Sequence, residues 1–143
     1  NTETLSLGAT NYFSRKKGQF IYGKQNLFNG AFGLIPDKLD GFLSSSDVPT
    51  LDINHKKLNG TFLVCYFSRE SFYKKLEGLA SGSGSKRIHE TTLLDIEIHL
   101  PSLEEQAQIA NFLSVINKKL ETEKLILGNY IKQKRYLLNQ MFT

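Results

Sequence analysis

The longest regular pattern of apolar and polar residues in this chain runs through its last third, residues 101–143. From Ile109 onward, apolar residues recur alternately four and three positions apart, which is the spacing of a heptad repeat. The pattern predicts one uninterrupted coiled-coil helix, a rod of roughly 60 Å. Its predicted core positions, all apolar except Glu123 and Lys134, are Ile109, Leu113, Ile116, Leu120, Glu123, Leu127, Tyr130, Lys134, Leu137 and Met141.

A helix start signal precedes this repeat. Ser102 follows Pro101, and Glu105 stands three residues after the serine. This spacing predicts a capping box, in which each of the two side chains accepts a hydrogen bond from the backbone amide of the other residue. We therefore expect the helix to begin close to Ser102.

A helix with a long apolar stripe needs something to cover the stripe, because each apolar side chain contributes about 1.5–3 kcal/mol only when it is buried. The two polar core residues indicate how a second copy would pair. In an antiparallel homodimer centred between Gly128 and Asn129, Glu123 of one copy faces Lys134 of the other, whereas parallel pairing brings like charges together. The alternatives are a similar helix on a second protein, or packing of the helix on its own domain.

Residues 1–100 show shorter and less regular patterns. Short apolar or alternating stretches bounded by turn residues predict strands, and two stretches have helical spacing. The predicted strands lie around residues 5–7, 19–22, 48–53 and 96–100, and the predicted helical stretches are 61–79 and 90–95. The chain is therefore predicted to be α+β, with a small mixed-sheet domain at residues 1–100 and one long helix at residues 101–143.

Charge and cysteine content narrow the function classes only slightly. The chain has 18 Lys and Arg against 14 Asp and Glu, a net charge of +4 that permits nucleic-acid binding without indicating it. The single Cys65 excludes an internal disulfide and fits a reducing compartment, so we expect a cytoplasmic protein. No apolar run approaches the eighteen or so residues of a membrane span.

The motifs of common enzymes are missing from the sequence. His55, His89 and His99 stand far apart, without the spacing of a zinc site. There is no phosphate-binding Walker loop, no dinucleotide-binding glycine motif and no nucleophile elbow. We therefore expect no catalytic site, no metal and no cofactor in this chain.

Four polar segments of residues 1–100 carry side chains that can bind DNA. Lys and Arg bind phosphates, and Asn, Gln, Ser and His supply hydrogen bonds to phosphates and base edges. Each segment alone is typical of a solvated loop, but the four together, on a domain without a catalytic set, favour binding. The candidate DNA-binding residues are Arg15, Lys16, Lys17, Lys24, Gln25, Asn26, Asn29, Ser44, Ser45, Ser46, Ser83, Ser85, Lys86, Arg87 and His89.

Three stretches resemble the specificity subunits of Type I restriction-modification systems. PSLEEQAQIANFL, residues 101–113, resembles the start of the family's conserved helical regions. GSGSKRIHETTLLDIEIHLP, residues 82–101, resembles the end of a target recognition domain, and FIYGKQNLFNGAFG, residues 20–33, resembles its early strand and glycine-rich loop. The resemblance covers essentially the whole chain and is most specific over residues 96–113.

The resemblance implies a non-catalytic component that recognises a split DNA sequence. Specificity subunits hold two recognition domains apart with antiparallel helices. They direct partner methylation and restriction subunits, to which S-adenosylmethionine, ATP and magnesium would belong. A complete subunit has two recognition domains and two helical regions, whereas this chain has one of each. The resemblance therefore implies a half-subunit that pairs with a second copy, or a fragment whose other half supplies the partner helix.

Two alternatives come from other functional classes. The chain could be a protein-assembly module, in which the coiled coil joins proteins and residues 1–100 bind a peptide. It could also be a fragment of a fused restriction-methylation enzyme whose catalytic domain lies outside these residues.

Overall fold

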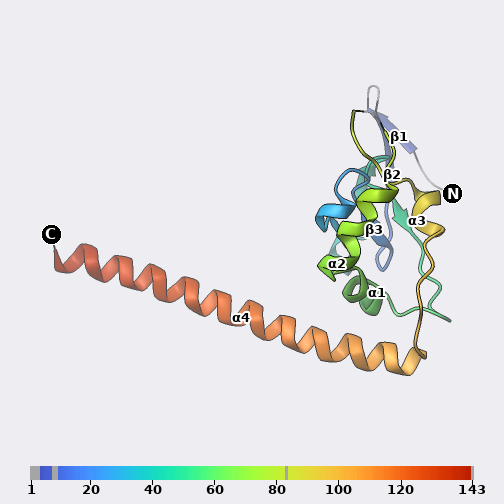
Figure 1. Ribbon diagram of the computed structural model, residues 1–143. Helices are drawn as coiled ribbons and strands as arrows, with labels where there is room; N and C mark the ends of the chain where they lie inside the picture. The colour runs from blue at the N-terminus through green and yellow to red at the C-terminus, as the bar shows by residue number, and fades with distance from the viewer. Residues whose placement is uncertain (1–3, 8–9, 83, 143) are drawn as a thin grey trace. The chain divides into compact units, whose positions relative to one another are not determined.

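The computed structural model describes residues 4–7, 10–82 and 84–142 and divides the chain into two compact units, residues 1–107 and 108–143 (Figure 1). The first unit contains short strands and helices. The long helix α4, Leu103–Met141, begins in the first unit and supplies the second. Small sheets with one long helix confirm the predicted α+β class, and the predicted functional boundary after residue 100 stays a prediction.

The described strands form two three-stranded antiparallel sheets, with the orders β1-β2-β5 and β4-β3-β6. In the first sheet Tyr12 lies opposite Ser45, and in the second Phe20 lies opposite both Leu34 and Leu51. The strands are β1 (Thr4–Leu7), β2 (Thr10–Ser14), β3 (Phe20–Tyr22), β4 (Phe32–Leu34), β5 (Leu43–Ser45) and β6 (Thr50–Leu51). The helical segments before α4, with 3-10 turns written η, are η1 (Leu27–Asn29), η2 (Asp37–Leu39), α1 (Gly60–Phe67), α2 (Glu70–Tyr73), η3 (Lys74–Leu79) and α3 (Glu90–Leu94).

The core of the first unit is built on β3, the central strand of the second sheet. Phe20 on β3 packs against Phe67 on α1, with ring centroids 5.1 Å apart, and Phe67 meets Phe72 edge to face at 5.0 Å. Tilted and edge-to-face pairs of this kind stabilise a core beyond the area that they bury. The buried cluster consists of Phe20, Tyr22, Leu27, Leu63, Phe67, Leu76, Ile88 and Leu93.

The helix predicted over residues 61–79 is interrupted. The helix α1 ends at Phe67, and the amide and the hydroxyl of Ser68 both donate to the Val64 carbonyl, at 2.9 and 2.8 Å. Arg69 then adopts an extended conformation and places its guanidinium 3.9 Å from the centre of the Tyr66 ring. The single predicted helix is therefore wrong, although Leu76 still reaches the core through η3.

The strand predicted at residues 96–100 is also wrong. Ile96 and Ile98 pack against the core while Glu97 and His99 are exposed, so the alternation describes the burial of residues 96–99, whereas Leu100 is exposed. Among the residues that the structure describes, however, no strand pairs with it. Alternating burial needs only an apolar surface on one side, whereas a strand also needs a neighbouring edge.

The start of α4 confirms the predicted capping box. The Ser102 amide donates to the Glu105 carboxylate at 2.9 Å, and the Glu105 amide donates to the Ser102 hydroxyl oxygen at 3.3 Å. The Ser102 hydroxyl also donates to the same carboxylate at 2.8 Å. These hydrogen bonds favour the ionised form and lower the pKa of Glu105.

A buried amide ties the first turn of α4 to the rest of the first unit. Gln106 is 1% exposed; its Oε1 accepts from the Asn59 amide at 2.8 Å, and its Nε2 donates to the carbonyls of Lys57 and Pro101, both at 3.0 Å. Asn59 in turn caps α1 by accepting from the Phe62 amide at 3.0 Å. One side chain therefore joins the starts of two helices.

We expect Gln106→Ala to lower the free energy of unfolding by about 1–3 kcal/mol, because it leaves the partly buried Asn59 amide and two carbonyls without this partner. Urea unfolding measures the change. Gln108→Ala, at an exposed position of the same helix, is the matched control and should stay within about 0.5 kcal/mol of wild type. Equal effects of the two substitutions would contradict the anchoring role.

Candidate nucleic-acid interface

Arg15, which follows β2, is bonded to β5 and to the turn after β5, residues 46–49. Its Nε donates to the Ser44 hydroxyl at 2.7 Å, and its Nη2 donates to the carbonyls of Ser45 and Val48 at 3.3 and 3.2 Å. Its Nη1 reaches the Thr50 hydroxyl at 3.4 Å. The planar fork of a guanidinium can serve several acceptors at once, so Arg15 holds the two ends of this turn together.

The environment of Arg15 fits an internal role. Burial lowers the pKa of Arg15, and the negative charge of Glu90 partly opposes this effect. The guanidinium also lies 5.1 Å from the centre of the Phe13 ring. The structure therefore supplies Arg15 with partners inside the protein, and its contact with DNA stays a prediction.

The turn after β5 also meets two other predicted segments. The Lys24 amide donates to the Asp47 carbonyl, and the Ile88 amide donates to the Lys24 carbonyl, both at 2.9 Å. The side chains continue this contact: Arg87 Nε donates to the Asp47 carboxylate at 3.3 Å, and Lys24 Nζ pairs with Glu90 at 3.0 Å. We call Lys24, Asp47, Arg87 and Glu90 the charged cluster.

Ile88 positions the basic end of the loop at residues 81–89. Its side chain is fully buried in the core, and its carbonyl accepts from the Tyr22 hydroxyl at 3.3 Å. Burial raises the pKa of Tyr22, so this hydroxyl remains a donor. The side chains that flank Ile88 are thereby held beside Lys24.

The same loop is closed at its base. Ser81 and Arg87 exchange two backbone hydrogen bonds, at 2.9 and 2.8 Å. Gly82 has a φ of +121°, and a Cβ at this position would lie 2.5 Å from the Ser85 carbonyl oxygen. Only glycine fits this bend without displacing backbone, which explains one glycine of this loop.

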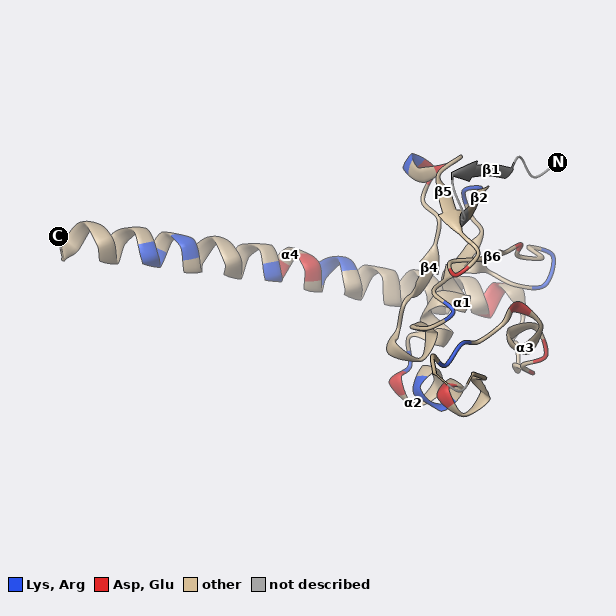
Figure 2. Ribbon diagram, turned by 90° about the horizontal axis from the view of Figure 1, so that it is seen from above, with Lys and Arg blue, Asp and Glu red and all other residues tan. Residues whose placement is uncertain are grey.

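Most of the predicted DNA-binding cations are paired with carboxylates. Sequence reasoning missed these acidic partners because they come from other segments of the chain. Figure 2 shows the Lys and Arg positions of residues 1–107 interspersed with Asp and Glu positions. The pairs are Lys17 with Asp37 (3.6 Å), Lys24 with Glu90 (3.0 Å), Lys86 with Glu77 (2.7 Å) and Arg87 with Asp47 (3.3 Å).

Such pairs are weak where they are solvated, at about 0–1 kcal/mol each, so they set the local charge more than they hold the fold. The pair of Lys24 and Glu90 is the least solvated, with the lysine side chain 12% exposed. Burial alone raises the pKa of Glu90, but a backbone hydrogen bond and Lys24 outweigh this effect, so that its pKa is lowered. Glu90 therefore stays ionised at neutral pH.

The remaining predicted DNA-binding residues lie outside the charged cluster. Lys16 and Lys17 donate through their backbone amides to the side chains of Gln19 and Asp40, both at 2.9 Å. The side-chain amide of Asn29 donates to that of Asn26 at 3.3 Å. Ser46, Ser85 and His89 are exposed, Gln25 is half-buried, and Ser83 lies outside the described residues.

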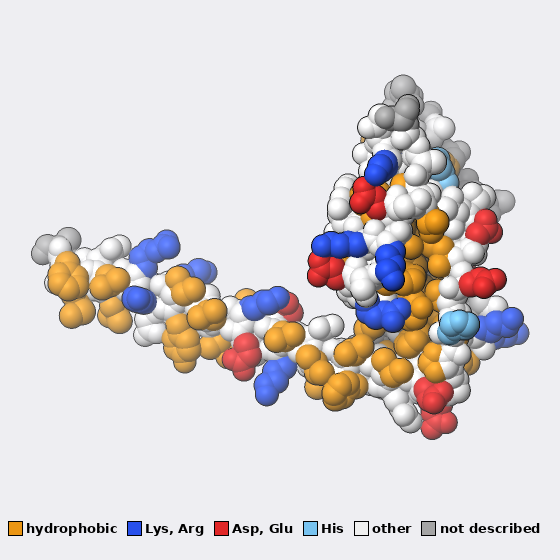
Figure 3. All heavy atoms as spheres, in the orientation of Figure 1, with side chains coloured by type: hydrophobic (Ala, Val, Ile, Leu, Met, Phe, Trp, Pro, Cys, Tyr) orange, Lys and Arg blue, Asp and Glu red, His pale blue; other side chains and the backbone are white. Residues whose placement is uncertain are grey.

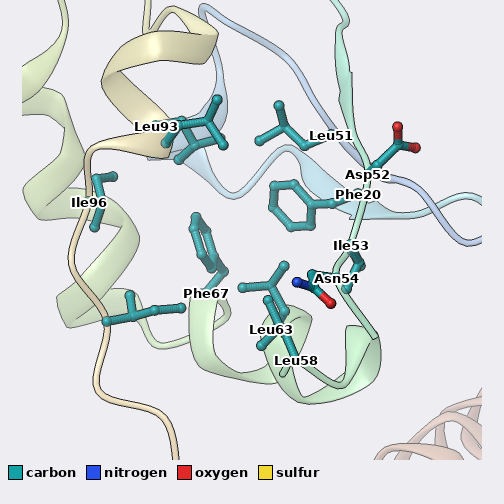
Figure 4. Close-up of a pocket in the computed structure, with 12 residues that line it drawn as sticks. Phe20, Leu51, Asp52, Ile53, Asn54, Leu58, Leu63, Phe67, Leu93 and Ile96 are labelled. Atoms are coloured by element: carbon teal, nitrogen blue, oxygen red, sulfur yellow. The ribbon is translucent and has the colours of Figure 1, made fainter. Parts of the chain in front are cut away.

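An apolar hollow of about 240 Å³ opens beside the core of the first unit (Figure 4). Its apolar lining comes from β3 (Phe20), α1 (Leu63 and Phe67), α3 (Leu93) and the segment after α3 (Ile96). Its polar lining residues are Asp52 and Asn54. Among the described residues, no group of three or more His, Cys, Asp and Glu could hold a metal ion.

Helix α4 carries its predicted apolar stripe in the open. It is one continuous helix of 39 residues, roughly 58 Å long, without a break at Gly128. Leu113 is half-buried, and the other apolar core positions are exposed, from Ile116 at 39% to Met141 at 72%. Figure 3 shows hydrophobic side chains at the surface along the helix. No described helix is long and apolar enough to cross a membrane. The long helix fits the predicted coiled coil.

Comparison with known proteins now assigns the family. Residues 3–133 match the Type I restriction modification DNA specificity domain. The chain is also 32% identical, over 88 residues, to the specificity subunit of the Type I restriction enzyme MjaVIII of Methanocaldococcus jannaschii. This match covers 62% of the chain and 21% of that subunit, so the chain spans about a fifth of the length of this relative.

The chain therefore belongs to the family of Type I restriction-modification DNA specificity domains. The resemblance seen in the sequence is confirmed. Membership also supports DNA sequence recognition within a restriction-modification system as the function of the domain.

We expect Arg15→Lys to lower the free energy of unfolding by about 1–2 kcal/mol, because one ammonium group cannot serve the four acceptors of the guanidinium. Urea unfolding of Lys16→Ala, an exposed neighbour, is the control and should show little change. An Arg15→Lys variant as stable as wild type would contradict the internal role of Arg15.

Proposed function

We propose that this chain recognises DNA sequence as the specificity component of a Type I restriction-modification enzyme and directs the methylation and cleavage that partner subunits carry out. The family match over residues 3–133 is the observation that carries this proposal. The chain itself would be non-catalytic, with S-adenosylmethionine, ATP and magnesium bound by the methylation and restriction subunits. We place the complex in the cytoplasm, which the single Cys65 favours because a lone thiol needs no oxidising compartment.

The meeting of several polar segments supports the DNA-binding part of the proposal. Hydrogen bonds join the turn after β5 to Arg15, to Lys24 and to Arg87, which come from three other parts of the chain. A surface of this kind can place Lys and Arg on phosphates while Ser, Asn and Gln reach base edges. Bonding between segments fixes the relative positions of such groups, which base recognition requires.

The open stripe of α4 supports pairing with a second helix of the same kind. We propose antiparallel pairing in which Glu123 of one helix faces Lys134 of the other. The partner is a second copy of this chain, or the corresponding helix of a second half where the chain is part of a longer subunit. Two paired helices would set the distance between two recognition domains.

The apolar hollow favours one competing function. The apolar hollow is lined by Phe20, Leu63 and Phe67 and suits an apolar side chain. In this alternative, residues 1–100 bind a peptide and α4 joins proteins. Selection from a random pool of DNA duplexes separates the two functions. Enrichment of one sequence supports DNA recognition, and a pool without enrichment supports the assembly module.

We expect the double substitution Lys86→Ala and Arg87→Ala to weaken binding to the selected duplex. It should also flatten the dependence of log K on log salt by up to about 0.9 for each lost phosphate contact. The control is Lys74→Ala with Lys75→Ala, which removes the same charge from η3. Equal losses in the two variants would contradict a local contact of the 81–89 loop.

We expect Glu123→Lys to loosen the dimer, because two lysines then face each other at each of two places in the antiparallel register. Adding Lys134→Glu to the same chain should restore pairing, as measured by analytical ultracentrifugation over a concentration series. Glu121→Lys, an exposed position outside the predicted core, is the control. A double variant that remains as loose as Glu123→Lys would contradict the register.

A further inference from the structure

The pair of Asp47 and Arg87 lies open to solvent on a fixed backbone. The two side chains are 53% and 36% exposed, and they meet at 3.3 Å. The Asp47 carbonyl accepts from the Lys24 amide, and Arg15 holds the turn on both sides of Asp47. The carboxylate can therefore change partners while the backbone of the turn stays in place.

Both basic residues of the 81–89 loop are neutralised by carboxylates from elsewhere in the chain. Asp47 lies 40 positions from Arg87, and Glu77 pairs with Lys86 at 2.7 Å. A DNA phosphate that takes Arg87 has to displace Asp47. The freed carboxylate then lies beside the negatively charged phosphates of the DNA. This repulsion disfavours the complex unless the carboxylate accepts a hydrogen bond from a donor on the DNA.

We propose that Asp47 is a specificity-determining residue, whose carboxylate holds Arg87 in the free protein and moves onto a base amino group in the recognised sequence. The amino group at N4 of cytosine is the donor that carboxylates accept from in the major groove. On any other sequence Asp47 is left unpaired beside phosphates, so non-specific binding is weakened. This inference rests on the proposed function of the chain in DNA recognition.

The exchange has a consequence for salt dependence. When Arg87 binds a phosphate, a salt cation is released from the DNA. The Asp47 carboxylate, left unpaired, takes up a salt cation at the same time, which cancels this release. Asparagine at position 47 gathers none. Non-specific binding by Asp47→Asn should therefore depend more steeply on salt than binding by wild type, by up to about 0.9 in slope.

The test compares the full chain with its Asp47→Asn variant, which keeps the shape and the backbone contacts of the turn. Wild type first selects duplexes from a random pool, and both proteins are then titrated with the enriched duplex and with a scrambled one. We expect Asp47→Asn to bind the scrambled duplex about two- to fivefold more tightly. It should not gain on the enriched duplex, so the specificity ratio falls, and repeating the selection with the variant should lose one cytosine preference.

Two controls separate this role from a general gain in positive charge. Glu70→Gln makes the same charge change on α2, in the ion pair of Glu70 with Lys74 of η3, and should leave the specificity ratio unchanged. In an Arg87→Ala background, the effect of Asp47→Asn on the salt slope should disappear, because Asp47 then lacks Arg87 in both the free and the bound protein and takes up no additional cation on binding.

The outcomes are distinct. Equal effects of Asp47→Asn and Glu70→Gln, an unchanged specificity ratio, or a cytosine preference that persists in the variant would each overturn the inference while the proposed function stands. A wild-type chain that enriches no sequence would overturn the proposed function, and this inference with it.

Discussion

The bonding of Arg15 to β5 and to the turn after it is the constraint on which the rest of the proposed recognition surface depends. Ser44 lies on β5 and Asp47 on that turn, and the Asp47 carbonyl accepts from the Lys24 amide. Ile88 is buried in the core and its amide donates to the Lys24 carbonyl. The neighbouring Arg87 therefore reaches Asp47, although the two residues lie 40 positions apart in the sequence. A guanidinium that satisfies several internal acceptors thus lets exposed polar groups keep fixed positions without a large core beneath them.

The second constraint acts along α4. The capping box and the buried Gln106 fix the start of this helix, and the helix continues without a break to Met141 as one rod. The exposed apolar stripe on the rod leaves apolar surface to be covered. Helix rigidity and apolar pairing together suit a spacer between two sequence-reading domains. In the proposed assembly the recognition surface would determine which bases are bound, and the rod would determine how far apart two such surfaces stand.

Local features were predictable from the sequence, and distant ones were not. The capping box of Ser102 and Glu105, the continuity of α4 and the strand near Phe20 depend on neighbours within a few residues. Gln106, whose partner amide lies 47 positions away, and Asp47, 40 positions from Arg87, carry no local signal. The alternation indicated the burial of residues 96–99 correctly, but not the exposure of Leu100 and not the pairing, because the sequence does not say which segment lies alongside. The DNA contacts themselves stay predictions. Three of the four polar segments that composition singled out are nevertheless joined by hydrogen bonds to the turn after β5, through Arg15, Lys24 and Arg87.

Binding of the purified chain to a random pool of duplexes, followed by sequencing of the retained DNA, tests DNA recognition most directly. With two copies paired through α4, we expect enrichment of a split sequence whose halves are related by two-fold symmetry. A retained pool with the same sequence distribution as the input would contradict it.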